Sequence, residues 1–216
     1  MKNLLAARRP AAAATLAACL AGCIEPQVAV NPRANFATIQ RVAVVTFGGA
    51  NGDLAADLLT QQLVAHGANV VERQQLLAIL REQGLANSGI LDPRTVREVG
   101  KILGVDALFV GTVAQSRDSQ SYVVTDNGRR GRGAVTAIGG RTVVPEGPVL
   151  GVPNSQVFTT EATASVISRL VDVQTGSILW SASMSYEGFD VPSAMQSILE
   201  AFVHSLVPIW PQLIDK

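Results

Sequence analysis

Cysteine, histidine and aromatic residues are all scarce in this chain of 216 residues. The sequence has two cysteines, two histidines (His66 and His204) and 5% aromatic residues. Neither histidine has a cysteine or another histidine at a spacing typical of a metal site, so we expect both to be helix-end or surface residues. No serine–histidine–acid set and no distinctive carboxylate pair stands out either. The sequence therefore predicts no enzyme, no metal and no cofactor.

An excess of positive charge is also missing. The chain has 17 basic and 17 acidic residues, but Lys2, Arg8 and Arg9 precede Cys23 and no acid does. The part after Cys23 therefore carries 14 basic and 17 acidic residues, a net charge of about −3. This balance gives no electrostatic reason to expect nucleic-acid binding. The abundant Ala, Val, Leu and Gly instead indicate a compact α/β core of small aliphatic side chains.

The apolar run near the N-terminus is too short to span a bilayer stably. It extends from Ala11 to Leu20, follows the basic residues and ends in Leu20-Ala21-Gly22-Cys23. These features predict a signal peptide over residues 1–22. The last four residues resemble a lipobox, in which a cysteine thiol receives diacylglycerol and small residues before it admit the peptidase. The alternative is an ordinary cleaved signal that contains a cysteine.

Lipidation of Cys23 would leave the mature chain without a free thiol. Cys19 lies in the predicted signal and is removed with it, so neither a disulfide nor a thiolate metal site is possible. Two or three acyl chains, such as palmitate, would make membrane attachment effectively permanent. Ile24 follows the cysteine, whereas an Asp there commonly retains a Gram-negative lipoprotein in the inner membrane. The sequence therefore favours the outer membrane, with the domain facing the periplasm.

A single α/β domain is predicted over residues 39–207, after a lipidated tether over residues 23–38. Hydrophobic patterning gives the order β-α-β-α-α-β-insertion-β-β-α, which indicates a mixed β-sheet packed by helices. Strands are expected at residues 40–47, 69–72, 105–113, 158–173 and 178–187, and helices at 54–64, 74–83, 92–103 and 191–207. Asp53 is the expected N-cap of the first helix and Gly67 its end.

Residues 208–216 form the predicted C-terminal tail. It contains Trp210 between two prolines. The sequence leaves open whether this indole packs on the core of its own chain or on a neighbouring molecule.

The segment from Ser116 to Gln156 stands apart because it is rich in glycine and proline. A membrane-spanning strand needs about 9–11 alternating residues. Residues 133–144 fit one such strand and residues 119–126 a shorter partner, but the glycines and prolines argue against an extended hairpin. The tip would carry Arg129, Arg130 and Arg132. These arginines suit phosphate, lipopolysaccharide or an acidic protein surface, and a solvated loop tip is the alternative.

Several segments together resemble the CsgG-like family. They are Arg41 to Phe47, Val70 to Arg73, Leu76 to Leu80, Gly84-Leu85, Ser88-Gly89, Gly100 to Leu108, Gly111 to Val113 and Leu170 to Ser181. The resemblance covers about residues 38–206 without the insertion. The same α/β design also occurs in lipoprotein activators of peptidoglycan synthases and in flagellar accessory lipoproteins.

The resemblance implies a non-enzymatic outer-membrane lipoprotein that assembles or exports curli or a similar surface structure through contacts with protein partners or further copies of itself. The best-known member forms a ring whose subunits each add two transmembrane hairpins to one large β-barrel. Here residues 181–187 pass directly to the last helix, which leaves no room for a second hairpin. The lack of room for a second hairpin favours a periplasmic binding module without a pore. The alternatives are an oligomeric secretion channel with a β-barrel and a lipoprotein activator of a peptidoglycan synthase.

Overall fold

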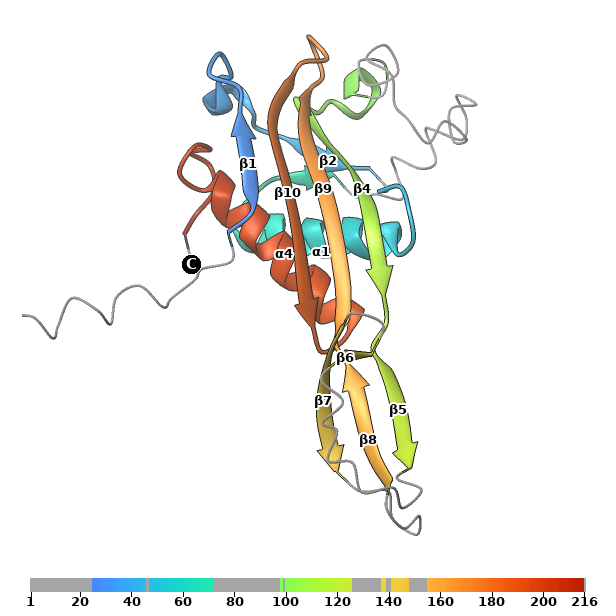
Figure 1. Cartoon of the computed structure of the whole chain (residues 1–216). Coiled ribbons are helices and arrows are strands. Elements are labelled where there is room, and N and C mark those ends of the chain that lie inside the picture. Colours follow the sequence, from blue (N-terminus) through green and yellow to red (C-terminus); the bar gives the residue numbers. More distant parts are fainter. Residues whose placement is uncertain are drawn as a thin grey trace, which may run out of the picture.

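A mixed six-stranded sheet forms the body of the protein (Figure 1). The computed structural model describes residues 25–45, 47–71, 98, 100–125, 137–138, 141–147 and 155–215. The strand order is β1-β10-β9-β4-β2-β3. The strands are β1 (Gln27–Val30), β2 (Val42–Val44), β3 (Val70–Val71), β4 (Ala107–Arg117), β9 (Ala162–Asp172) and β10 (Ile178–Gly188). Since β2 is parallel to β3 and β4 while the other pairs are antiparallel, the predicted mixed α/β sheet is confirmed.

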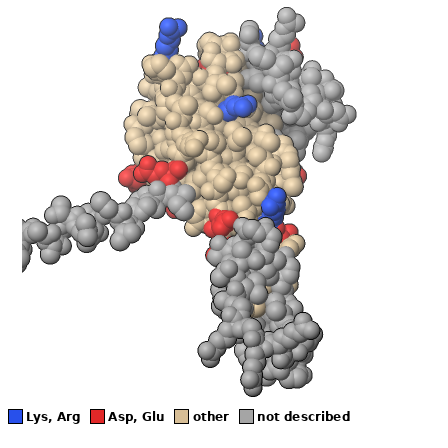
Figure 2. All heavy atoms as spheres, in the orientation of Figure 1, with Lys and Arg blue, Asp and Glu red and all other residues tan. Residues whose placement is uncertain are grey.

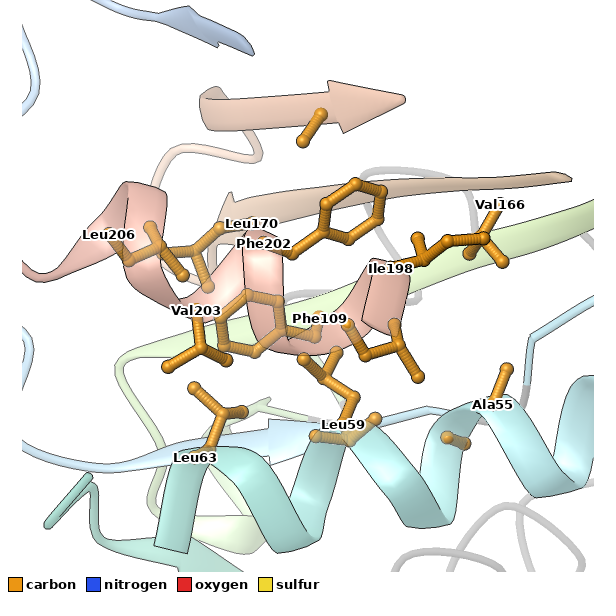
Figure 3. Close-up of a cluster of buried hydrophobic side chains, with 14 of the residues drawn as sticks. Ala55, Leu59, Leu63, Phe109, Val166, Leu170, Ile198, Phe202, Val203 and Leu206 are labelled. Atoms are coloured by element: carbon orange, nitrogen blue, oxygen red, sulfur yellow. The ribbon is translucent and has the colours of Figure 1, made fainter. Parts of the chain in front are cut away.

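Two helices, α1 (Gly52–Ala65) and α4 (Val191–Leu206), pack together on one face of this sheet. Leu59 and Leu63 of α1, four residues apart, lie on the same side of the helix and point toward the sheet and α4 (Figure 3). Phe109 of β4 and Phe202 of α4 are fully buried between the layers. Each such side chain contributes about 1.5–3 kcal/mol on burial, so this cluster holds the helices on the sheet.

The N-cap of the first helix is Asn51 and not Asp53, so the predicted N-cap is wrong. Asn51 adopts the left-handed conformation (φ 61°), which asparagine tolerates better than most residues. Its side-chain amide donates to the Ser116 hydroxyl at 2.8 Å. Asp53 therefore lies within the first turn. The predicted end at Gly67 is confirmed, with φ +88°.

Residues 27–38 belong to the fold, so the predicted tether over residues 23–38 is wrong in most of its length. β1 pairs antiparallel with β10, from Gln27 opposite Ser183 to Val30 opposite Trp180. A 3-10 turn over Phe36–Thr38 follows, and the Phe36 side chain is buried. The two prolines of the segment stand on either side of β1, where they need not donate to the ladder.

The C-terminal tail packs on its own chain. Trp210 is 1% exposed, and its indole Nε1 donates to the backbone carbonyl of Ile39 at 3.1 Å. Leu213 is also buried, and the backbone N–H of Ile214 donates to the carbonyl of His66. Trp210 and Leu213 of the tail are thus part of the core, so the indole packs on its own chain.

The described parts of the insertion form a second antiparallel sheet in the order β5-β8-β7-β6, here called the arm. Its strands are β5 (Gln120–Thr125), β6 (Ala137–Ile138), β7 (Arg141–Gly147) and β8 (Ser155–Thr160). The arm continues the β4–β9 ladder beyond one end of the main sheet (Figure 1).

Two predicted strands differ from those observed in this region. The single strand over residues 133–144 is wrong, because Ile138 pairs with Arg141 in a hairpin between β6 and β7. The strand over residues 158–173 is interrupted at Glu161, where the chain passes from the arm to the main sheet. The predicted strand over residues 119–126 agrees closely with β5. The direct passage from β10 to α4 is confirmed as well.

Several predictions lie outside the described residues. They are the signal peptide over residues 1–22, the lipid acceptor Cys23, the helix over residues 74–83 and the three arginines of the insertion. Of the helix predicted at residues 92–103, the described positions 98 and 100–103 are helical, and Gly104 (φ +62°) ends it as expected. In the described part of the chain, no helix is long and apolar enough to cross a membrane.

Candidate interaction surface

The face of the main sheet opposite α1 and α4 is only partly covered. Along β9, alternate residues such as Ala164, Val166 and Ser168 are buried on the helix side. The residues between them, including Ser165 and Ile167, point to the other side and are partly exposed. One end of that side is covered by a smaller cluster that includes Leu103, Val105 and Leu108. The remainder, across β1, β10, β9 and β4, is here called the open face.

A groove of about 530 Å³ lies on the open face. The residues that line it include Gln27, Gln115, Ser165, Ile167, Ser183 and Ser185. The hydroxyls of Ser165 and Ser185 form a hydrogen bond across the β9–β10 pair at 2.7 Å. The β4–β9 register shifts between Val113 and Gln115, so β4 carries an extra residue beside the groove. Small side chains and a local bulge therefore produce the groove.

Ionisable groups are few in the groove, although Arg169 of β9 and Glu187 of β10 lie on the same face of the sheet. Among the described residues that line the groove, Glu25 alone is ionisable. Figure 2, which views the molecule from this side, shows few charged side chains over the main sheet. Interface cores are depleted in charged residues, while hydroxyls both donate and accept hydrogen bonds. The groove, with Ile167 among serines, therefore has a composition suited to bind protein.

The two histidines meet in the structure, which the sequence did not indicate. His66 ends α1, His204 lies in the last turn of α4, and their ring centroids are 5.3 Å apart at an angle of 82°. Both are helix-end residues as expected, but His66 is buried and its Nδ1 lies 2.8 Å from the carbonyl of Gln62. His204 approaches Glu200 at 3.8 Å and Asp215 at 4.0 Å.

No metal site results from this contact. Among the described residues, no group of three or more His, Cys, Asp or Glu side chains could hold a metal ion. The contact follows from the packing of α1 against α4, which brings together the ends of two helices far apart in sequence. Spacing along the chain could not have revealed it.

The turn between β10 and α4 presents an exposed aromatic residue that the sequence did not single out. Phe189 is 83% exposed. It precedes the N-cap Asp190, whose side chain accepts a hydrogen bond from the Ser193 backbone N–H at 2.8 Å. This bond, and then the one from the Ser193 side chain, hold the pKa of Asp190 below its usual 3.8. An apolar residue before an N-cap often packs on the first turn of the helix, whereas Phe189 stays exposed.

Comparison with known families identifies the chain. The family model described as Curli production assembly/transport component CsgG matches residues 24–194. The chain belongs to the CsgG family. The resemblance predicted from the sequence is thereby confirmed, and the match includes β1, in agreement with its place in the sheet. A search of curated proteins gave no match.

Solved structures similar to this CsgG-family chain are distant in sequence. A PelC dodecamer from Paraburkholderia phytofirmans is 18% identical, with 88% of this chain and 99% of that chain covered and a TM-score of 0.46. The lipoprotein GNA1162 from Neisseria meningitidis is 19% identical, with coverage of 78% and 97% and a TM-score of 0.45. The LpoB C-terminal domain from Salmonella enterica is 17% identical, with coverage of 68% and 83% and a TM-score of 0.40.

Proposed function

We propose that this protein is an outer-membrane lipoprotein, acylated on Cys23, that helps to assemble or export a surface structure. It acts without catalysis, by binding protein partners in the periplasm. Membership of the CsgG family, over residues 24–194, is the observation that carries this proposal. The sequence Leu20-Ala21-Gly22-Cys23 and the Ile24 that follows it support the anchor and its membrane.

The open face is the surface that we assign to the partner. A partner that covers Ile167 removes an exposed apolar side chain from water, and the surrounding serines supply hydrogen bonds at little desolvation cost because they are neutral. Stable interfaces bury about 800 Å² on each partner, so the contact extends beyond the groove to neighbouring strands. A protein partner or a further copy of the chain can meet these requirements.

The experiment that tests the proposal compares wild type with Cys23→Ser in the native host. We expect wild type to fractionate with the outer membrane and to show an acylated N-terminal cysteine by mass spectrometry. The variant should remain an unprocessed precursor or appear as soluble material, and assembly of the surface structure should fall. Equal processing, equal membrane attachment and equal assembly in the variant would contradict the proposal.

A control separates loss of the anchor from loss of the fold. Circular dichroism of purified Cys23→Ser should match that of wild type, because the described domain begins beyond this residue. A folded but mislocalised variant attributes the defect to the anchor.

A further inference from the structure

The position of β1 limits how far the domain can stand from the lipid anchor. Gln27 is already hydrogen-bonded into the sheet opposite Ser183, so only residues 24–26 connect it to Cys23. Four steps of fully extended chain span at most about 14 Å. If Cys23 is acylated, as the proposed function requires, its Cα lies at the membrane interface and β1 lies no farther than this from it.

This reach is short compared with the dimensions of the sheet. Six strands at about 4.8 Å spacing place the β3 edge about 24 Å from the β1 edge. The anchor therefore cannot reach a membrane that touches the β3 edge. β1 is the edge strand nearest the anchor, and its own outer edge has no neighbour in the described sheets.

An end-on arrangement would require the arm to enter the bilayer. Gln27, the first residue of β1, lies opposite Ser183, and β10 continues beyond this point for about 17 Å to its end at Gly188. The arm projects farther in the same direction (Figure 1). With the membrane at this end, the anchor could be reached only if the arm entered the bilayer. The opposite end of the sheet, at Ile178, is also about 17 Å from Gln27 along the strand direction. This distance again exceeds the reach of the anchor.

The surface chemistry also distinguishes the edge from the open face. Val28 and Val30 of β1 are 40% and 42% exposed, and both pair with residues that face the helix side of the sheet. The groove on the open face presents serine hydroxyls and Glu25, which would lose water without gaining partners against lipid. The unpaired backbone groups of β1 can instead bond to lipid headgroups and interfacial water.

We propose that the β1 edge rests on the lipid surface, with Val28 and Val30 in contact with the headgroup region. The short connection to the anchor then holds the domain in a defined orientation on the membrane. The open face stands at an angle to the membrane and stays free for a protein partner. This inference depends on acylation of Cys23 and adds the surface that the membrane contacts.

The test uses full-length acylated protein in vesicles of phosphatidylethanolamine and phosphatidylglycerol. Single spin labels are placed by Val28→Cys, Ile167→Cys or Phe189→Cys, since the acylated chain has no other free thiol. Collision with oxygen, which partitions into lipid, is compared with collision with a water-soluble nickel chelate. We expect the ratio to shift toward oxygen at position 28 and to stay at the value for water at positions 167 and 189.

Each other outcome overturns the inference. A lipid-like ratio at position 189 means that the arm end enters the bilayer, and one at position 167 means that the open face lies on it. A water-like ratio at 28 means that the domain stands away, and protection from both reagents there means that protein covers the edge. Intact mass of the same samples reports acylation separately, so failure of the anchor is distinguishable from failure of the edge contact.

A second variant isolates the short connection. Insertion of ten Gly and Ser residues between Glu25 and Pro26 adds a root-mean-square reach of about 17 Å without altering the sheet. The oxygen-to-nickel ratio at position 28 should then fall to the value for water, with acylation and thermal unfolding unchanged. An unchanged ratio would mean that the edge does not owe its position to the short connection.

Discussion

The indole of Trp210 donates a hydrogen bond to the backbone carbonyl of Ile39, which precedes it by 171 residues. The bond joins the C-terminal tail to the segment that leads into β2, and both residues are buried. The tail also contacts α1 through His66 and Ile214. The C-terminal tail thus packs against the segment that leads into β2 and against the end of α1.

Trp210→Ala should destabilise the protein strongly, because it removes a buried indole and leaves a cavity. Such truncations cost about 3–5 kcal/mol, which lowers the Tm of a domain of this size by roughly 6–20 °C. Trp210→Phe retains most of the volume, loses the hydrogen bond and should cost about 1–2 kcal/mol. Thermal unfolding followed by circular dichroism measures both.

A control for the tail is Ile214→Ala, since this side chain is 62% exposed. It should change stability by about 0.5 kcal/mol or less. If Trp210→Ala unfolds at the same temperature as wild type, the tail is not docked in solution.

Gly111 of β4 should not tolerate a larger residue. An added Cβ would lie 2.5 Å from the Phe47 ring and 2.7 Å from the backbone carbonyl of Ile167. Overpacking of this kind costs about 1–3 kcal/mol, and chemical denaturation of Gly111→Ala should show it. The matched control is Gly48→Ala, because a Cβ there meets only the Thr112 side chain at 3.8 Å. Equal stability of the two variants would contradict the close packing of Phe47 on β4.

The N-cap of α4 should make stability depend on acidic pH. The folded-state pKa of Asp190 is lowered, so its contribution is present above the usual value of 3.8 and is lost as pH falls through the lowered folded pKa. Asp190→Ala should unfold at a lower temperature than wild type near neutral pH, and the difference should shrink in strong acid. Asp190→Asn can still cap the helix and should retain stability without this dependence. A difference that is constant across the acid range would show that the carboxylate charge has no part in the cap.

Sequence patterning predicted the elements whose residues repeat with a clear period. Leu59 and Leu63 on α1 are examples, because four-residue spacing places them on one side of a helix. β1 was missed because a strand of four residues carries little pattern and its partner, β10, lies about 150 residues away. The break at Glu161 was missed because alternation continues through it, while the transfer between sheets depends on three-dimensional twist.

The open face could be predicted only in part. The sequence separates β9 into two alternating sets, one with Ala164 and Val166 and one with Ser165 and Ile167. Both sets mix polar and apolar residues, and only Arg169 in the second set indicates which one faces away from the helices. The contact between His66 and His204 depends on helix packing and has no local signal.

The central claim is that a protein partner binds the open face while the chain is held at the membrane. The most direct measurement is photo-crosslinking in the native host, with a photoreactive amino acid at position 167 and, as control, at Ile178, which is 48% exposed at the end of β10. The account predicts a discrete crosslinked protein at position 167 that is absent at 178 and lost in Cys23→Ser. No crosslink at 167 in membrane-attached, folded protein, or the same products at both positions, would contradict it.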